Sequence, residues 1–456
     1  MSHRNLSRRS LLLAPSLLSG RSQLRQALQE APLGDTHEHL YSEKHRLSTH
    51  IDIFTLLAQY TISDLTSAGL DGKARAQLSN PEISIAERWR LAAPYWEKAR
   101  NTGFARAFEI ALRDIYGAPE LNEKTCEQIS ARIVAANRQG FTDRMLREKC
   151  RIRFAVVDDY YNTDPVKPDS PLYLSARRFD RFVSLTSKDA LQKLEAVTRS
   201  SIHSLADLER GLQSDFERNL KLAGMAVIKI GQAYLRPLYF RQVARRDAER
   251  EFEQVAGGEL PAESPSRFEQ LTQVRAKSLQ DYMLHRVIQL AREHKIPVQV
   301  HTGLHAGNRN YIPNSNPAHL INLFFEYPDV TFDLFHSGYP YLSEMAAIAK
   351  SFPNVYIDLT WIYIISPSAS QRALHEYLDT VPASKILGFG GDYHYAEMTY
   401  GHSVMAREII IRVLEQKVAD RYFTEPHAIA VGRRLLHDNA AEVFGWRQAP
   451  GVSQAG

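Results

Sequence analysis

Histidine and carboxylate side chains stand at the ends of short apolar runs, and these residue types are the ones that bind catalytic metals. His37 and His39 are two residues apart at the end of the first such run, and side chains two apart on a strand share a face. Later runs end in, or lead into, Lys229, His301, His336 and Asp392. Imidazole and carboxylate ligands suit Zn²⁺, Mn²⁺ or Fe²⁺, and a catalytic site leaves one coordination position open for water. The pattern therefore predicts a metal centre assembled from several strands.

The elements that must position these side chains alternate between short apolar runs and longer amphipathic stretches from Pro32 onward. This alternation is typical of a parallel sheet covered by helices. The predicted strands are one ending at 34–39, then 153–157, 181–185, 225–230, 297–301, 330–336, 355–359 and 386–390. Their number fits an α/β fold of the (β/α)₈ TIM-barrel type, whose active sites lie at the carboxyl ends of the strands. The candidate ligands fall at that end.

A block at 45–150 interrupts the alternation and has almost entirely helical periodicity. Apolar residues recur at three- and four-residue spacing over 52–60, 84–99, 104–116 and 120–139. Such a block is too long for an ordinary βα loop, so we predict a helical insertion over the mouth of the barrel. Later in the chain, one long helix is expected over 267–294. The expected organisation is an N-terminal extension at 1–30, the barrel at 31–446 and a disordered tail at 447–456.

The composition is that of a soluble globular protein, with 44% hydrophobic residues, 24% charged residues and a formal net charge of +4. There is no basic stripe with interleaved aromatic residues, so we expect no nucleic-acid partner. The apolar run at 11–18 is too short to span a bilayer, so we expect no membrane partner. Cys126 and Cys150 form no CxxC pair and are interpreted as free thiols.

The basic N-terminus supports two interpretations. Arg8 and Arg9, followed by an apolar run, resemble a twin-arginine export signal. Pro15 interrupts that run and no A-x-A cleavage site follows, so a disordered basic extension is the alternative. The sequence therefore leaves the location open between the cytoplasm and export.

Four short motifs carry a resemblance to a known family. The segments 37–39 (HEH), 300–303 (VHTG), 335–338 (FHSG) and 390–392 (GGD) resemble the metal-site motifs of the amidohydrolase superfamily. More closely, 297–303, 354–359 and 233–236 are similar to the amidohydrolase domain fused to glutamine synthetase in some fungal and plant proteins. Segments 93–96 and 115–117 are similar to the helical insertion of uronate isomerases. The resemblance covers roughly 30–446 and implies a metal-dependent enzyme.

The resemblance implies a role for each candidate residue. His37, His39, His301 and Asp392 would bind one divalent metal, with Zn²⁺ favoured over Mn²⁺ and Fe²⁺. Asp392 would also carry the proton of the attacking water, and His336 would polarise the scissile carbonyl. A substrate carboxylate would be bound by Lys229 and Arg236. Further residues expected at the pocket are Tyr234, His305, Asn308, Trp361 and His394.

Three alternatives remain open at this stage. In binuclear relatives a carboxylated lysine bridges two metals, so Lys229 with His301 and His336 could hold a second metal, although one metal is favoured. The leading function is hydrolysis of a C–N or C–O bond in a small carboxylate-bearing molecule. The same ligands support a decarboxylase or a uronate-type isomerase, and a non-catalytic binding barrel is the third interpretation. The oligomeric state also stays open, although members of the resembled family are often dimers or larger.

Overall fold

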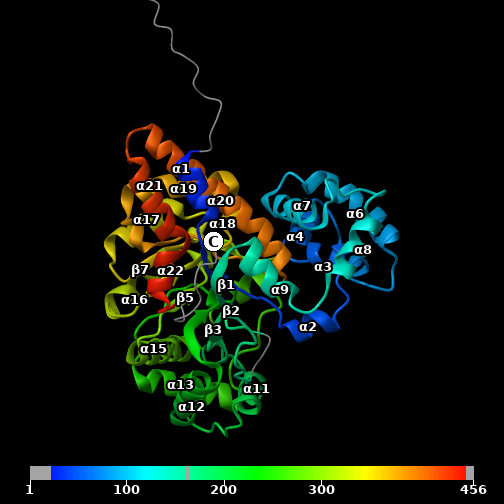
Figure 1. Ribbon diagram of the computed structural model, residues 1–456. Helices are drawn as coiled ribbons and strands as arrows, with labels where there is room; N and C mark the ends of the chain where they lie inside the picture. The colour runs from blue at the N-terminus through cyan, green and yellow to red at the C-terminus, as the bar shows by residue number, and fades with distance from the viewer. Residues whose placement is uncertain (1–21, 161–163, 448–456) are drawn as a thin grey trace, which may run out of the picture.

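The computed structural model describes residues 22–160 and 164–447 of the chain. Eight parallel strands form one sheet in sequence order (Figure 1). They are β1 (Leu33–Glu38), β2 (Ile152–Asp158), β3 (Tyr173–Arg178), β4 (Met225–Ile230), β5 (Val298–Val300), β6 (Phe332–Leu334), β7 (Val355–Asp358) and β8 (Ile386–Leu387). Beyond β8, the amide of Thr36 donates to the carbonyl of Phe389 at 3.0 Å, which joins the first strand to the last. The (β/α)₈ barrel predicted from the sequence is confirmed.

Helices follow the strands and cover the outside of the barrel. They are α10 (Asp180–Val183), α11 (Lys188–Thr198), α12 (Leu205–Ala223), α13 (Arg245–Gly257), α14 (Arg267–Thr272), α15 (Lys277–His294), α16 (Ile321–Glu326), α17 (Leu342–Ser351), α18 (Ile362–Ile365), α19 (Pro367–Thr380), α20 (Ala396–Ala419), α21 (Glu425–Arg433) and α22 (Asn439–Val443). Their apolar faces pack on the strands in one large buried cluster, and this burial is the main stabilisation of the fold.

Eight α-helices lie between β1 and β2, blue to cyan in Figure 1, and most of them pack together beside the barrel, whereas Phe141 of the last one packs in the barrel core. They are α2 (Glu43–Ser48), α3 (Ile53–Leu57), α4 (Thr61–Ser67), α5 (Gly72–Leu78), α6 (Ile85–Ala99), α7 (Gly103–Tyr116), α8 (Cys126–Ala136) and α9 (Phe141–Arg144). Capping residues in the sequence stabilise the N-termini of these helices: Asp52 caps α3, and Ser84 forms a capping box with Glu87 at α6. We call these helices the insertion. It has its own apolar core, which also contains Trp361, Tyr393 and Tyr395 from the barrel loops.

The third strand is not where the sequence was interpreted to place it. Residues 181–185 were predicted as a strand, but Asp180–Val183 is the helix α10 and the strand is Tyr173–Arg178. Ala176 pairs with Val227 of β4, whereas Phe182 and Val183 are buried on one helical turn. The two apolar residues of that turn follow each other directly, which is compatible with either structure from periodicity alone.

Two other boundaries differ from the prediction. The single helix expected over 267–294 is divided into α14 and α15, where Ala276 adopts a left-handed φ of 45°. Helix α1 (Gln23–Glu30) lies inside the expected extension, and its Arg25 forms ion pairs with Glu408 and Glu415 of α20.

The twin-arginine segment and residues 448–456 lie outside the described residues. Both cysteines are buried and free. Across the described ranges no helix combines the length and apolar character needed to cross a membrane.

Candidate metal centre

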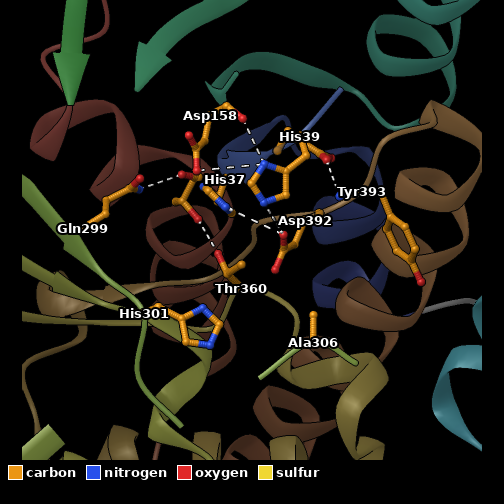
Figure 2. A network of polar contacts seen from close by, with 12 residues as sticks. His37, His39, Asp158, Gln299, His301, Ala306, Thr360, Asp392 and Tyr393 are labelled. Carbon is orange, nitrogen blue, oxygen red and sulfur yellow. Dashed lines mark hydrogen bonds and ion pairs between the residues drawn. The ribbon is translucent and has the colours of Figure 1, made fainter. Parts of the chain in front are cut away.

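Three of the predicted ligands meet at the carboxyl end of the barrel (Figure 2). His37, His39 and Asp392 each offer an atom within 4.8 Å of the others. The Oδ1 atom of Asp392 lies 3.7 Å from Nε2 of His37 and 3.3 Å from Nε2 of His39. Two imidazoles and one carboxylate are a donor set for a divalent cation. His37 and His39 project from the end of β1 and Asp392 from the segment after β8, which the closed barrel makes neighbours.

The backbone around Asp392 is built for close approach. A Cβ on Gly390 would lie 1.9 Å from Oγ1 of Thr360, and one on Gly391 would lie 1.9 Å from Oε1 of Glu38, so no larger residue fits at either position. The amide of Asp392 donates to the carbonyl of His37 at 2.8 Å. These contacts bring the carboxylate against the two histidines.

The tautomer of His39 suits a metal ligand. Its Nδ1 lies 2.9 Å from the carbonyl oxygen of Asp158, and because a carbonyl only accepts, Nδ1 carries the proton and Nε2 presents a lone pair toward Asp392. Burial lowers the pKa of His39 to about 3 and the pKa of His37 well below its usual value. Both rings are therefore neutral, the form in which imidazole binds a metal.

His301 lies in the wall of the same cavity but outside the three-residue group. Its Nε2 donates to the carbonyl of Leu304 at 3.0 Å, which turns Nδ1 toward Nε2 of His336 at 3.2 Å. His336 donates from Nδ1 to the carbonyl of Thr360 at 3.0 Å, so its Nε2 also presents a lone pair. That Nε2 lies 4.0 Å from Oδ2 of Asp392. Two lone pairs facing each other beside a carboxylate need a proton or a cation between them.

Lys229 is a second unusual feature, at the inner wall of the cavity. The side chain is 1% exposed, its Nζ has no hydrogen-bond partner among the described residues, and Nζ lies 3.2 Å from the ring centroid of Phe335. Burial, reinforced by the nearby charge of Arg178, lowers the pKa of Lys229 to about 7. A buried lysine of this kind is typical of a functional site rather than of a structural ion pair.

The metal-binding group opens into a cavity of about 790 Å³ between the barrel and the insertion. Its inner wall comes from the barrel, where the sequence-predicted residues lining it are His37, His39, Lys229, Tyr234, His301, Asp392 and His394. Its outer wall comes from the insertion and includes Gln59, Tyr60 and Arg75. A volume of this size accepts a small organic molecule.

Arg236 has a different place from the one predicted for a residue that binds a substrate carboxylate. Its guanidinium is buried against Asp281, with Nη2 2.6 Å from Oδ1, and also donates to Gln280 at 3.2 Å. It is not among the residues that line the cavity. The pattern of charges after β4 did not distinguish a buried ion pair from a pocket residue.

Arg178, which was not predicted, is the arginine at the end of β3 that lines the cavity. It donates from Nε to Oδ2 of Asp158 at 2.7 Å. Sequence reasoning missed it because the strand was assigned to 181–185. The alternation of 173–178, which ends in two arginines, was the signal that could have found it.

Four other predicted residues lie behind the cavity or at its edge and are not part of its lining. His336 is fully buried. His305 stacks on His301 with ring centroids 5.3 Å apart, and the ring centroids of Trp361 and His336 are 5.0 Å apart. Asn308 donates to the carbonyl of Ser63 at 3.1 Å, which joins a barrel loop to the insertion.

Comparison with known proteins agrees with this architecture. A family model described as amidohydrolase matches residues 234–446. Protein fluG of Emericella nidulans is 30% identical over 183 residues, which are 39% of this chain and 21% of fluG. The match assigns residues 234–446 to the amidohydrolase superfamily. The chain spans only about a fifth of the length of that curated relative.

Solved structures share the fold of this chain over nearly its full length. A glucuronate isomerase from Caulobacter crescentus has a TM-score of 0.73 and 18% identity, covering 94% of each chain. A protein from Lactobacillus casei described as a metal-dependent hydrolase has a TM-score of 0.63 and 16% identity, covering 92% of this chain and 97% of its own. Both isomerases and hydrolases therefore stand among its structural neighbours.

Proposed function

We propose that the chain is a metal-dependent hydrolase that cleaves a C–N or C–O bond in a small carboxylate-bearing molecule. The observation that carries this proposal is the group of His37, His39 and Asp392 at the inner wall of a cavity that is also lined by Arg178 and Lys229. The neutral imidazoles and the fixed tautomer of His39 fit a divalent metal. Zn²⁺ is the favoured metal, with Mn²⁺ and Fe²⁺ as alternatives.

The metal ligands, Asp392 and Arg178 have different roles in this reaction. A metal bound by these three residues would lower the pKa of a coordinated water to about 7. Oδ1 of Asp392 faces the two histidines and Oδ2 faces His336, so one oxygen is free to accept the proton of the attacking water and return it to the leaving group. Arg178 offers its guanidinium to the substrate carboxylate.

The cluster of Lys229, His301 and His336 supports a second metal as the alternative to a mononuclear site. The facing lone pairs of His301 and His336, 3.2 Å apart, are a donor arrangement. The unpartnered Nζ of Lys229, whose pKa lies near 7, is available for carboxylation. Metal content per chain distinguishes the two states, and mass spectrometry of the native protein detects the added carboxyl group.

A uronate-type isomerase or a decarboxylase is the second candidate, because the same donor set serves those reactions. The specific observation is that a glucuronate isomerase aligns with 94% of this chain, so most of the insertion is included. In that case His336 and Asp392 would move protons between substrate carbons and oxygens.

The experiment combines metal analysis with isotope labelling. Purified full-length protein is reconstituted with Zn²⁺, Mn²⁺ or Fe²⁺ and incubated in H₂¹⁸O with N-acyl amino acids, lactones and uronates. Hydrolysis places one ¹⁸O in the product, isomerisation changes no mass, and decarboxylation releases carbon dioxide. His39→Asn should lose metal, whereas His50→Asn, a cavity histidine outside the group, should keep it. A wild-type chain that takes up no metal would refute the proposal.

A further inference from the structure

We propose that the insertion completes the metal centre: Gln59 and Tyr60 are positioning residues for Asp392. The two residues lie in the turn between α3 and α4, more than three hundred positions before their target. The inference rests on the proposed function in one respect, namely that Asp392 binds the metal. It assigns to the insertion a part in metal binding, beyond forming a wall of the cavity.

Three hydrogen bonds join this turn to the segment that carries the carboxylate. Tyr60 donates from its hydroxyl to the carbonyl oxygen of Asp392 at 2.5 Å, and Gln59 donates from Nε2 to the same oxygen at 3.2 Å. The Oε1 atom of Gln59 accepts from the amide of His394 at 2.6 Å. The side-chain amide of Gln59 thus bridges the backbone on both sides of Tyr393.

The segment needs this support because its conformation is unfavourable alone. Asp392 has a φ of 61°, in the left-handed region, and such a residue costs about 1–3 kcal/mol unless its surroundings fix it. On one side, the extension of β1 fixes the segment through the bond from the amide of Asp392 to His37 and the bond from the amide of His39 to Tyr393. On the other side, the carbonyl of Asp392 is fixed by the insertion.

The turn is itself firmly placed. The ring of Tyr60 packs against three other aromatic rings. Its centroid lies 4.7 Å from that of Trp361, 5.0 Å from that of Tyr393 and 5.3 Å from that of Phe104. Tyr60 is only 8% exposed. Gln59 and Tyr60 also line the cavity, so a bound molecule contacts the residues that orient the metal ligand.

The test measures metal affinity and backbone protection in the full-length chain. Gln59→Met, Tyr60→Phe and the double variant are compared with wild type by Zn²⁺ competition against a chromophoric chelator. Loss of an outer hydrogen bond to a metal ligand typically weakens binding by about 10- to 100-fold, which is the loss expected for the double variant. The visible spectrum of the Co²⁺-loaded protein should change as the carboxylate reorients.

Tyr116→Phe is the matched control. It removes the same atom from the same insertion, where the hydroxyl donates to Glu397 of α20 at 2.8 Å, and it should leave Zn²⁺ affinity within about twofold of wild type. Hydrogen exchange gives a readout that needs no metal: the amide of His394 should exchange faster in Gln59→Met than in Tyr116→Phe.

The outcomes separate the two ideas. If wild type binds Zn²⁺ and the double variant binds it equally well, the positioning role is overturned and the proposed function stands. If wild type binds no metal, both the proposed function and the positioning role are refuted. If the variants bind too poorly to purify in the loaded form, unchanged exchange at His394 in Gln59→Met would still refute the inference.

Discussion

Replacing Arg236 with methionine separates a structural role for this residue from a role in substrate binding. The guanidinium and the Asp281 carboxylate are each no more than 2% exposed in their side chains and lie 2.6 Å apart. Removing one member of a buried pair leaves an uncompensated charge and costs about 3–5 kcal/mol. Lys277 also contacts Asp281, so the lower end of that range, about 3 kcal/mol, is expected for Arg236→Met.

That cost converts to a measurable shift in thermal unfolding. The unfolding entropy is about 2.1 cal/mol/K per residue, and the chain has 456 residues. Each kcal/mol lost from the free energy of unfolding therefore lowers the midpoint temperature by roughly 1 °C, so Arg236→Met should lower it by roughly 3 °C. The companion variant Arg236→Met/Asp281→Asn should recover part of the loss, because it removes the stranded charge. Metal affinity and KM for the substrate should not change. A variant of unchanged midpoint but strongly raised KM would show that Arg236 contacts substrate after all.

The other predictions concern the metal, the substrate and pH. Zn²⁺ at about 100 times its dissociation constant should stabilise the wild type by about 2.7 kcal/mol, and chemical denaturation should show no such gain for His39→Asn. Arg178→Met should raise KM for a carboxylate substrate by about 10- to 100-fold, the value of a charged hydrogen bond, with little change in KM for the corresponding amide. Burial raises the pKa of Asp358 above its usual range, and the pKa of the neighbouring Asp333 is raised as well, so the folded state keeps a proton that the unfolded state releases near pH 3.9. Stability from this pair is therefore full below about pH 4 and is lost as pH rises through the raised pKa, and Asp358→Asn should reduce that slope in unfolding curves measured from pH 4 to 7.

Much of the barrel followed from local sequence. The run at 225–230 matches β4 residue for residue, because a β-branched apolar run between polar stretches has few other structures open to it. His37, His39 and Asp392 were identified by position at strand ends, and the closed barrel brings them together. The parallel topology does this without any contact readable from the sequence.

The features that the sequence did not show come from tertiary contacts. The orientation of the His301 ring depends on the carbonyl of Leu304, which loop geometry determines. Arg236 and Arg178 differ in burial and in partner, and neither property is visible in a charge pattern. Gln59 and Tyr60 were covered by a predicted helix over 52–60, and nothing in that periodicity indicated contacts with Asp392.

The two separate apolar cores affect which positions can be replaced during evolution. One wall of the substrate cavity is anchored in the insertion, whose interior is largely distinct from that of the barrel. Replacements on that wall, at positions such as Arg75, can alter which molecules enter while the strands that carry the histidines keep their packing. Changes at such positions leave the metal-binding group in place, whereas changes at the residues that link the insertion to the barrel, Gln59 and Tyr60 among them, reach the Asp392 segment.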